Sequence, residues 1–160
     1  MTAGALQDLA AVAGVGVLSA LVPLVNIEAY LGVRGSVAGL DSVWLLGFVA
    51  ALGQMLGKLV WYYLGASSLG WAWVRRRVEK PKAQERLARW RSRTHERPVV
   101  AGGLVFVSAL SGFPPLAILA VVAGQLRMSV VLFFVLGLLG RWLRFSAVLG
   151  GAQWLAHVVR

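Results

Sequence analysis

Four ionisable residues stand in otherwise apolar stretches of the sequence, and they are the side chains best placed to do chemistry. They are Glu28, Lys58, Arg141 and Arg144. A charge at the centre of a lipid bilayer costs at least about 2.5–3.5 kcal/mol, so an ionisable residue in an apolar segment is a functional candidate that needs a partner. Arg144 follows Arg141 by three positions, which places both on one face of a helix.

Glu28 and the two arginines have complementary chemistry. A carboxylate in dehydrated surroundings can bind and release a proton near physiological pH, whereas arginines stay charged and their planar heads suit a phosphate group. Glu28 and its neighbour Asn26, beside Arg141 and Arg144, would therefore suit a proton-coupled carrier of an anionic headgroup. The simpler alternatives are that Glu28 pairs with an arginine to pin two helices, and that Lys58 extends to the membrane interface.

Signatures of known enzymes are scarce. The chain has no HExxH, no G-x-S-x-G and no paired carboxylates of a membrane phosphotransferase. Ser111-Gly112 faintly resembles an intramembrane serine protease, but a suitably placed histidine is lacking. The absence of cysteine excludes disulfides, thiolate metal sites and cysteine nucleophiles. We therefore predict that the protein is not an enzyme and uses no cofactor and no metal.

The composition indicates an integral membrane protein. Of the 160 residues, 59% are hydrophobic and only 14% are charged, with a mean hydropathy of +0.75. Soluble domains typically have about 25% charged residues. At about 20 residues per spanning helix, the length allows a single membrane domain over 1–160 and leaves no room for a soluble catalytic domain. The N-terminal apolar run has no preceding Lys or Arg, so we expect it to stay in the mature protein.

Most of the net charge of +10 lies in one segment, residues 75–97, which contains ten Arg or Lys and three Glu. A basic segment can bind nucleic acid, but one that separates two hydrophobic halves is typical of a cytoplasmic loop. Ala83, Leu87 and Trp90 have the spacing of a short helix that lies on the membrane surface. The partners we predict are membrane lipids with anionic headgroups, and not nucleic acid.

The basic loop, 71–97, divides the chain into a first half, 1–70, and a second half, 98–160. SALVPLVNIEA and SALSGFPPLA, one in each half, both place Ser-Ala-Leu before a proline. FVAALGQMLGK and FVLGLLGRWLR also correspond, with Lys58 opposite Arg144. Such likeness arises by chance among apolar residues, or it marks the inverted repeats of a transporter whose broken helices meet near the midplane.

Helix-breaking residues interrupt both halves. The predicted breaks are Pro23 in the first half and Gly112, Pro114, Pro115 and Gly124 in the second. Each arm of 98–126 is shorter than the about 20 residues that a crossing needs, which suits a re-entrant hairpin that enters and leaves on one side. A single kinked helix is the alternative, since prolines occur in spanning helices. Arg127 favours the hairpin, because it then lies on the same side as the basic loop.

Four motifs in order resemble one family. They are VPLVNIEAYLG (22–32), with Glu28 as the acidic residue after a proline, ALGQMLGKLVWYYLG (51–65), FVSALSGFPPLAILAVVAGQLRMS (106–129) and GRWLRFSAV (140–148). In these motifs the chain resembles the DedA family of bacterial membrane proteins, which share the VTT (SNARE-associated Golgi) domain. It is most similar to the short YqaA-like branch of that family.

The resemblance implies two opposed re-entrant hairpins and movement of lipids between leaflets of the bacterial inner membrane. It implies undecaprenyl phosphate or a phospholipid as substrate, and coupling to a proton or sodium gradient. Larger DedA proteins have two arginines flanking the second proline break. Here those positions hold other residues, namely Ser111, Gly112, Ala117 and Ile118. Their arginine-based substrate handling is therefore not carried over, and our hypothesis is that Arg141 and Arg144 replace it.

These observations predict an all-α polytopic integral membrane protein, with an inverted pair of broken re-entrant helical hairpins, transmembrane helices and a basic cytoplasmic loop. The predicted function is transport of a lipid or a phosphate-headgroup lipid between leaflets. One alternative is a non-transporting scaffold that recruits partners or anionic lipid through residues 75–97, and another is a small ion channel. A homodimer is compatible with so small a transporter.

Overall fold

The secondary structure of the described residues is entirely helical. The computed structural model describes residues 3–22, 27–35, 40–68, 81, 85, 88–89, 92, 96–113 and 115–158. The helices are α1 (Ala3–Leu21), α2 (Ile27–Gly35), α3 (Leu40–Ser68), α6 (Pro98–Ser111), α7 (Leu116–Gln125) and α8 (Val130–Val158). The predictions for Pro23, Asn26, Pro114 and most of the surface helix around Leu87 lie outside the described residues.

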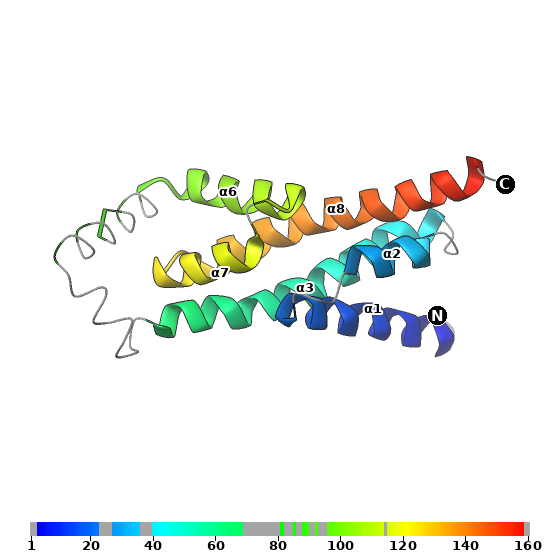
Figure 1. Cartoon of the computed structure of the whole chain (residues 1–160), viewed down its shortest axis with the longest axis horizontal. Helices are drawn as coiled ribbons and strands as arrows, with labels where there is room; N and C mark the ends of the chain where they lie inside the picture. Colours follow the sequence, from blue (N-terminus) through cyan, green and yellow to red (C-terminus); the bar gives the residue numbers. More distant parts are fainter. Residues whose placement is uncertain are drawn as a thin grey trace.

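Two long antiparallel helices, α3 and α8, run through the bundle and pack against each other (Figure 1). Each has 29 residues, which at 1.5 Å per residue gives a length of about 43 Å. Both contain an apolar stretch long enough to cross a membrane, Val43–Ser68 in α3 and Val130–Ala152 in α8. The prediction of membrane-crossing helices therefore rests on α3 and α8.

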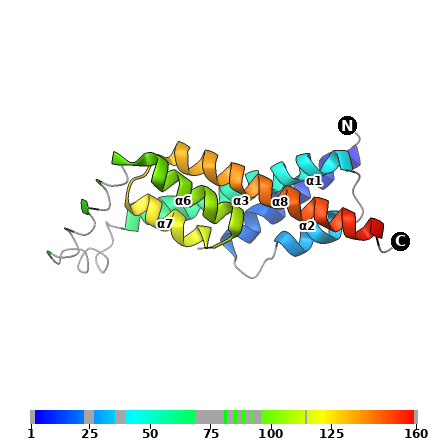
Figure 2. The ribbon, with the colours of Figure 1, turned by 90° about the horizontal axis from the view of Figure 1, so that it is seen from above.

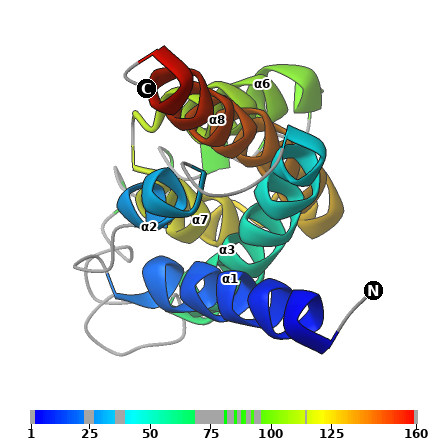
Figure 3. The ribbon, with the colours of Figure 1, turned by 90° about the vertical axis from the view of Figure 1, so that its right-hand side faces the viewer.

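The four shorter helices form two pairs that enter the bundle from opposite ends. α1 runs inward from one end and α2 returns toward it, while α6 and α7 do the same from the other end (Figure 1). Seen from above, the two pairs occupy opposite ends of the molecule (Figure 2). Each pair packs against both long helices, because α1 and α7 contact α3 while α2 and α6 contact α8. The view along the bundle shows α1 and α8 on opposite sides of α2 and α3 (Figure 3).

Each helix pair has its own hydrophobic core. The core beneath α1 and α2 consists of Val12, Ile27, Leu31, Val43, Ala50, Ala51, Phe145 and Leu149. The core beneath α6 and α7 consists of Met55, Tyr62, Val105, Ala109, Leu116, Ala120, Ala123, Met128 and Phe133. Phe133 and Phe145 of α8 are fully buried, one in each core. Each end of the bundle is thus held by its own apolar packing.

Glycines allow α3 and α7 to touch backbone to backbone. A β-carbon at Gly65 would collide with the carbonyl of Val121, and one at Gly124 would collide with the carbonyl of Tyr62. Gly124, which the sequence predicts as a hairpin break, lies in the last turn of α7 and serves this close packing instead. The chain reverses between α6 and α7, where Gly112 has a φ of +82°, in the left-handed region that favours glycine.

Glycines also place α1 on α3 and α6 on α8 in the same manner. In each case a glycine of the long helix faces two residues three positions apart on the short helix, namely Val17 and Ala20 opposite Gly57, and Phe106 and Ala109 opposite Gly140. Lys58 and Arg141, which directly follow the two glycines, therefore occupy matching positions. This register differs from the sequence comparison, which places Lys58 opposite Arg144.

Replacing Gly124 should destabilise the bundle, because the β-carbon of Gly124→Ala meets helix backbone that has no room to move aside. We expect a loss of about 1–3 kcal/mol in the free energy of unfolding, the range typical of overpacking. Gly103→Ala in α6 is the matched control. No atom lies within 4 Å of its β-carbon, so helix propensity should leave it neutral or up to about 1 kcal/mol more stable.

Unfolding of the detergent-solubilised protein, followed by circular dichroism, measures both variants. Equal stability of Gly124→Ala and Gly103→Ala would contradict the close α3–α7 packing.

Candidate functional site

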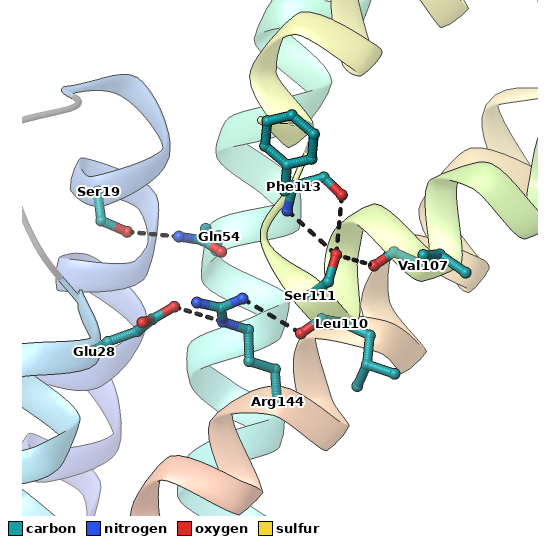
Figure 4. A network of polar contacts seen from close by, with 8 residues as sticks. All are labelled: Ser19, Glu28, Gln54, Val107, Leu110, Ser111, Phe113 and Arg144. Carbon is teal, nitrogen blue, oxygen red and sulfur yellow. Dashed lines mark hydrogen bonds and ion pairs between the residues drawn. The ribbon is translucent and has the colours of Figure 1, made fainter.

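Arg144 joins the inner ends of the two helix pairs at the middle of the bundle. It lies fourteen residues from each end of α8, about 21 Å along the helix from either terminus. Its Nε donates to Glu28 Oε1 of α2 at 2.6 Å, and its Nη1 donates to the carbonyl of Leu110 in α6 at 3.3 Å (Figure 4). One side chain therefore connects helices from both pairs.

The helix ends favour these contacts electrostatically. Glu28 is in the first turn of α2, where the helix dipole attracts negative charge. Leu110 is in the last turn of α6, where backbone carbonyls lack helical partners and attract a cation. The side chains of Arg144 and Glu28 are 24% and 33% exposed, so the pair is neither sealed in the core nor fully solvated.

The turn after α6 leaves room for the Arg144 guanidinium. A β-carbon at Gly112 would overlap that guanidinium, so a larger residue would displace it. Ser111 Oγ donates to the carbonyl of Val107 at 2.7 Å and accepts the Phe113 N–H at 3.2 Å (Figure 4). These local bonds organise the turn, while the Phe113 side chain stays 79% exposed. Gly112 thus acts both as a helix terminator and as part of the arginine site.

Lys58 caps the inner end of α1, as Arg144 caps the inner end of α6. The lysine is only 7% exposed, and its Nζ donates to the carbonyl of Ala20 at 2.9 Å. The indole Nε1 of Trp61 donates to the same oxygen, also at 2.9 Å. Lys58 is therefore buried, with its ammonium bonded to the end of α1.

Arg141 is the most buried of the arginines that the structure describes, with 9% of its surface exposed. Its guanidinium carbon lies 5.8 Å from the centre of the Phe145 ring, and its Nε has no hydrogen-bond partner. Its positive charge interacts electrostatically with the charges of Glu28, Arg144 and Lys58. Arg141 is thus part of the same central group of charges.

The central group has more positive than negative charge. Lys58, Arg141 and Arg144 provide three cations, and Glu28 provides one carboxylate. No Asp or Glu stands between Glu28 and Asp41 or anywhere after Glu96 in the sequence. Uncompensated cations in apolar surroundings are costly, and an anion placed among them relieves that cost.

Two polar residues of this region, Gln54 and Ser19, were not identified as site residues from the sequence. Gln54, the central residue of α3, donates from Nε2 to Ser19 Oγ at 3.2 Å, while its Oε1 has no partner. Ser19 in turn donates to the carbonyl of Gly16 at 2.8 Å. The signal that could have drawn attention to Gln54 is its position four residues before Lys58, on the same helix face.

The structure thus brings Glu28 and Arg144 into contact and places Arg141 and Lys58 within electrostatic range. Asn26 lies outside the described residues. Among the residues that the structure describes, no three His, Asp or Glu side chains group as they would to hold a metal ion.

The VTT domain model matches residues 22–152, which include all four central charged residues. The chain belongs to the VTT domain family, the domain of the DedA proteins. Comparison with curated proteins and with solved structures gave no match. The family is membrane-associated, in keeping with the two apolar long helices, and the YqaA-like branch stays a prediction.

The Glu28–Arg144 pair of this VTT domain should show energetic coupling in a double-mutant cycle. We expect an interaction energy of about 0.5–3 kcal/mol from Glu28→Gln, Arg144→Gln and the double variant, since each single change leaves the other group without its charged partner. Denaturant unfolding in detergent supplies the free energies.

The control is the Glu85–Arg89 pair, whose atoms are 3.9 Å apart and whose side chains are 70% and 72% exposed. Its coupling should be near zero. Strict additivity at Glu28 and Arg144 would show that the central contact does not stabilise the fold.

Proposed function

We propose that this VTT domain protein is a transporter that moves a lipid with a phosphate headgroup, such as undecaprenyl phosphate or a phospholipid, between the leaflets of the bacterial inner membrane. The observation that supports this most is the position of Arg144, which contacts Glu28 of one helix pair and Leu110 of the other at the middle of an apolar bundle. A phosphate-binding group and a proton-binding group meet there.

We further propose that the two helix pairs are re-entrant hairpins related as inverted repeats. α6 and α7 have 14 and 10 residues, about 21 and 15 Å, which is less than the roughly 30 Å hydrocarbon core. Ala20, near the end of α1, packs at Gly57, close to the middle of α3. The matching glycine contacts of α1 with α3 and of α6 with α8 support the repeat. Broken helices of this kind place exposed backbone at a midplane site.

The proposed mechanism is competition for Arg144. A phosphate that enters the centre can replace the Glu28 carboxylate on the guanidinium, because both anions suit the same bidentate geometry. Glu28 then loses its hydrogen-bonded partner, and it is the group through which we propose that transport is coupled to protons. Loss of the Arg144 contacts to Glu28 and Leu110 then removes a link between the two helix pairs, which allows their inner ends to separate.

Glu28→Gln tests the transport function. The amide can still accept the Arg144 hydrogen bond but cannot exchange a proton, so translocation should fall at least tenfold while the protein still folds. Movement of a fluorescent phosphate lipid across proteoliposome membranes, divided by the amount of folded protein, is the measurement. Glu96→Gln, an exposed residue outside the bundle, is the matched control and should transport normally.

Unchanged transport per folded Glu28→Gln molecule would leave Glu28 as a structural ion pair only. Replacing the exposed Arg89 and Arg97 by glutamine addresses the scaffold alternative, since transport should survive that change. Single-channel current through planar bilayers would instead favour the channel alternative.

Cysteine labelling tests the re-entrant topology, since the chain has no native cysteine. Ser92→Cys and Ser129→Cys flank α6 and α7 and are exposed, so both should react with an impermeant maleimide from the cytoplasmic side. Trp154→Cys, in the last turns of α8, should react only from the opposite side. Labelling of Ser92→Cys and Ser129→Cys from opposite sides would make 98–126 a single crossing.

A further inference from the structure

Lys58 and Arg141 occupy matching positions on the two long helices, each directly after a glycine that contacts a short helix. Lys58 follows Gly57, the contact of α3 with α1, and Arg141 follows Gly140, the contact of α8 with α6. Because α3 and α8 pack against each other, the two cations come from facing helices. They are close enough for their charges to repel.

Neither cation has a carboxylate of its own among the described ion pairs. The single carboxylate of the central group, Glu28, is bonded to Arg144 at 2.6 Å. Lys58 is bonded to a neutral carbonyl, that of Ala20, and Arg141 faces an aromatic ring. Lys58 caps α1 and Arg141 interacts with Glu28, but the one carboxylate is shared among three cations, so the central group keeps an excess of buried positive charge that an anion would offset.

Both side chains keep donors for a ligand. Arg141 is 91% buried with an unpartnered Nε, and Lys58 has three ammonium donors, of which one is bonded to Ala20. Gln54, one turn before Lys58, adds an unpartnered Oε1 that can accept a hydrogen bond from the hydroxyl of a singly protonated phosphate. The available groups are thus two cationic donors and one neutral acceptor.

We propose that Lys58 and Arg141 form a binding site for one phosphoryl group between α3 and α8, separate from the Glu28–Arg144 pair. The planar fork of Arg141 grips two phosphoryl oxygens, and Lys58 supplies the second positive charge. The attraction of each cation for the bound phosphoryl group outweighs the repulsion between the two cations. This assignment rests on the proposed function only for the source of the phosphate, which is a lipid headgroup rather than free phosphate.

The site is tested by the heat stability of the full-length protein in detergent, with and without ligand. Inorganic phosphate and dihexanoyl phosphatidate, a soluble phosphate lipid, are the two probes. We expect either probe to raise the melting temperature of the wild-type protein, and Arg141→Gln to weaken the apparent affinity at least tenfold. Arg127→Gln, an exposed arginine in the turn before α8, is the matched control and should respond like wild type.

The unliganded protein supplies a second readout that a structural role would not produce. Removing one of two repelling cations should leave the ligand-free melting temperature of Arg141→Gln unchanged or raised, whereas loss of a structural cation would lower it. Lys58→Arg keeps the charge and should retain binding, while Lys58→Gln should lose it. Equal responses of wild type and Arg141→Gln to both probes, or a clearly lowered ligand-free melting temperature of Arg141→Gln, would overturn the site.

The two probes and the transport assay together distinguish three claims: that the site exists, that its ligand is a lipid headgroup, and that the protein transports lipid. Tighter binding of dihexanoyl phosphatidate than of inorganic phosphate would support a lipid headgroup as the ligand. Equal affinity would support the site but identify free phosphate as its ligand. Arg141-dependent binding without lipid translocation by the wild-type protein would overturn the transport function and leave the phosphoryl site standing.

Discussion

The arrangement of the bundle depends on one arginine that bonds to two helix ends at once. Arg144 donates to a carboxylate in the first turn of α2 and to a carbonyl in the last turn of α6, and these two helices belong to pairs that enter from opposite ends. Helix ends within an apolar environment carry unsatisfied backbone groups that are costly to leave unpaired. A helix that stops halfway through the bundle therefore needs a polar partner at its tip. Arg144 meets that need for α6, and Lys58 together with Trp61 meets it for α1.

Close backbone packing makes this arrangement of short helices possible. Gly57 and Gly140 bring α1 and α6 against the long helices near their middles, which carries the helix ends within reach of Lys58 and Arg144. Because α2, α6 and α7 are too short to span a bilayer by themselves, they depend on the long helices for their position. Small residues at such contacts are the usual means by which helices associate in a membrane, where the hydrophobic effect contributes little to helix–helix packing. The same glycines that position the helices thus position the charges.

Much of the fold could be predicted from the sequence. The contacts that build the central site could not, for physical reasons that differ from residue to residue. Apolar length and charge placement correctly predict the helical class and the long helices, because each is a local property of the chain. The Glu28–Arg144 contact joins residues 116 positions apart, so the sequence presents the two groups as candidates without showing that they meet. The partner of Lys58 is a backbone carbonyl, and every residue has one, so no pattern of side chains predicts it. Gly124 lies in the last turn of α7 and also packs against α3, and sequence alone does not separate these two roles because a glycine that ends a helix and one that allows close packing look alike.

The balance of charge at the centre connects the architecture to the proposed transport function. A protein that needed only to join its two helix pairs would be served by Glu28 and Arg144, whose charges cancel. Arg141 and Lys58 add two positive charges to a group whose one carboxylate, Glu28, is bonded to Arg144, and the burial of both cations makes them costly to keep. An apolar bundle that retains such an excess is most stable when an anion is bound, and a transporter requires an occupied state distinct from its empty one. Because Arg144 holds both helix pairs, an anion that draws it away from Glu28 changes the contact between the pairs themselves. In the proposed mechanism, binding at the centre and separation of the inner helix ends are both consequences of Arg144 changing partners.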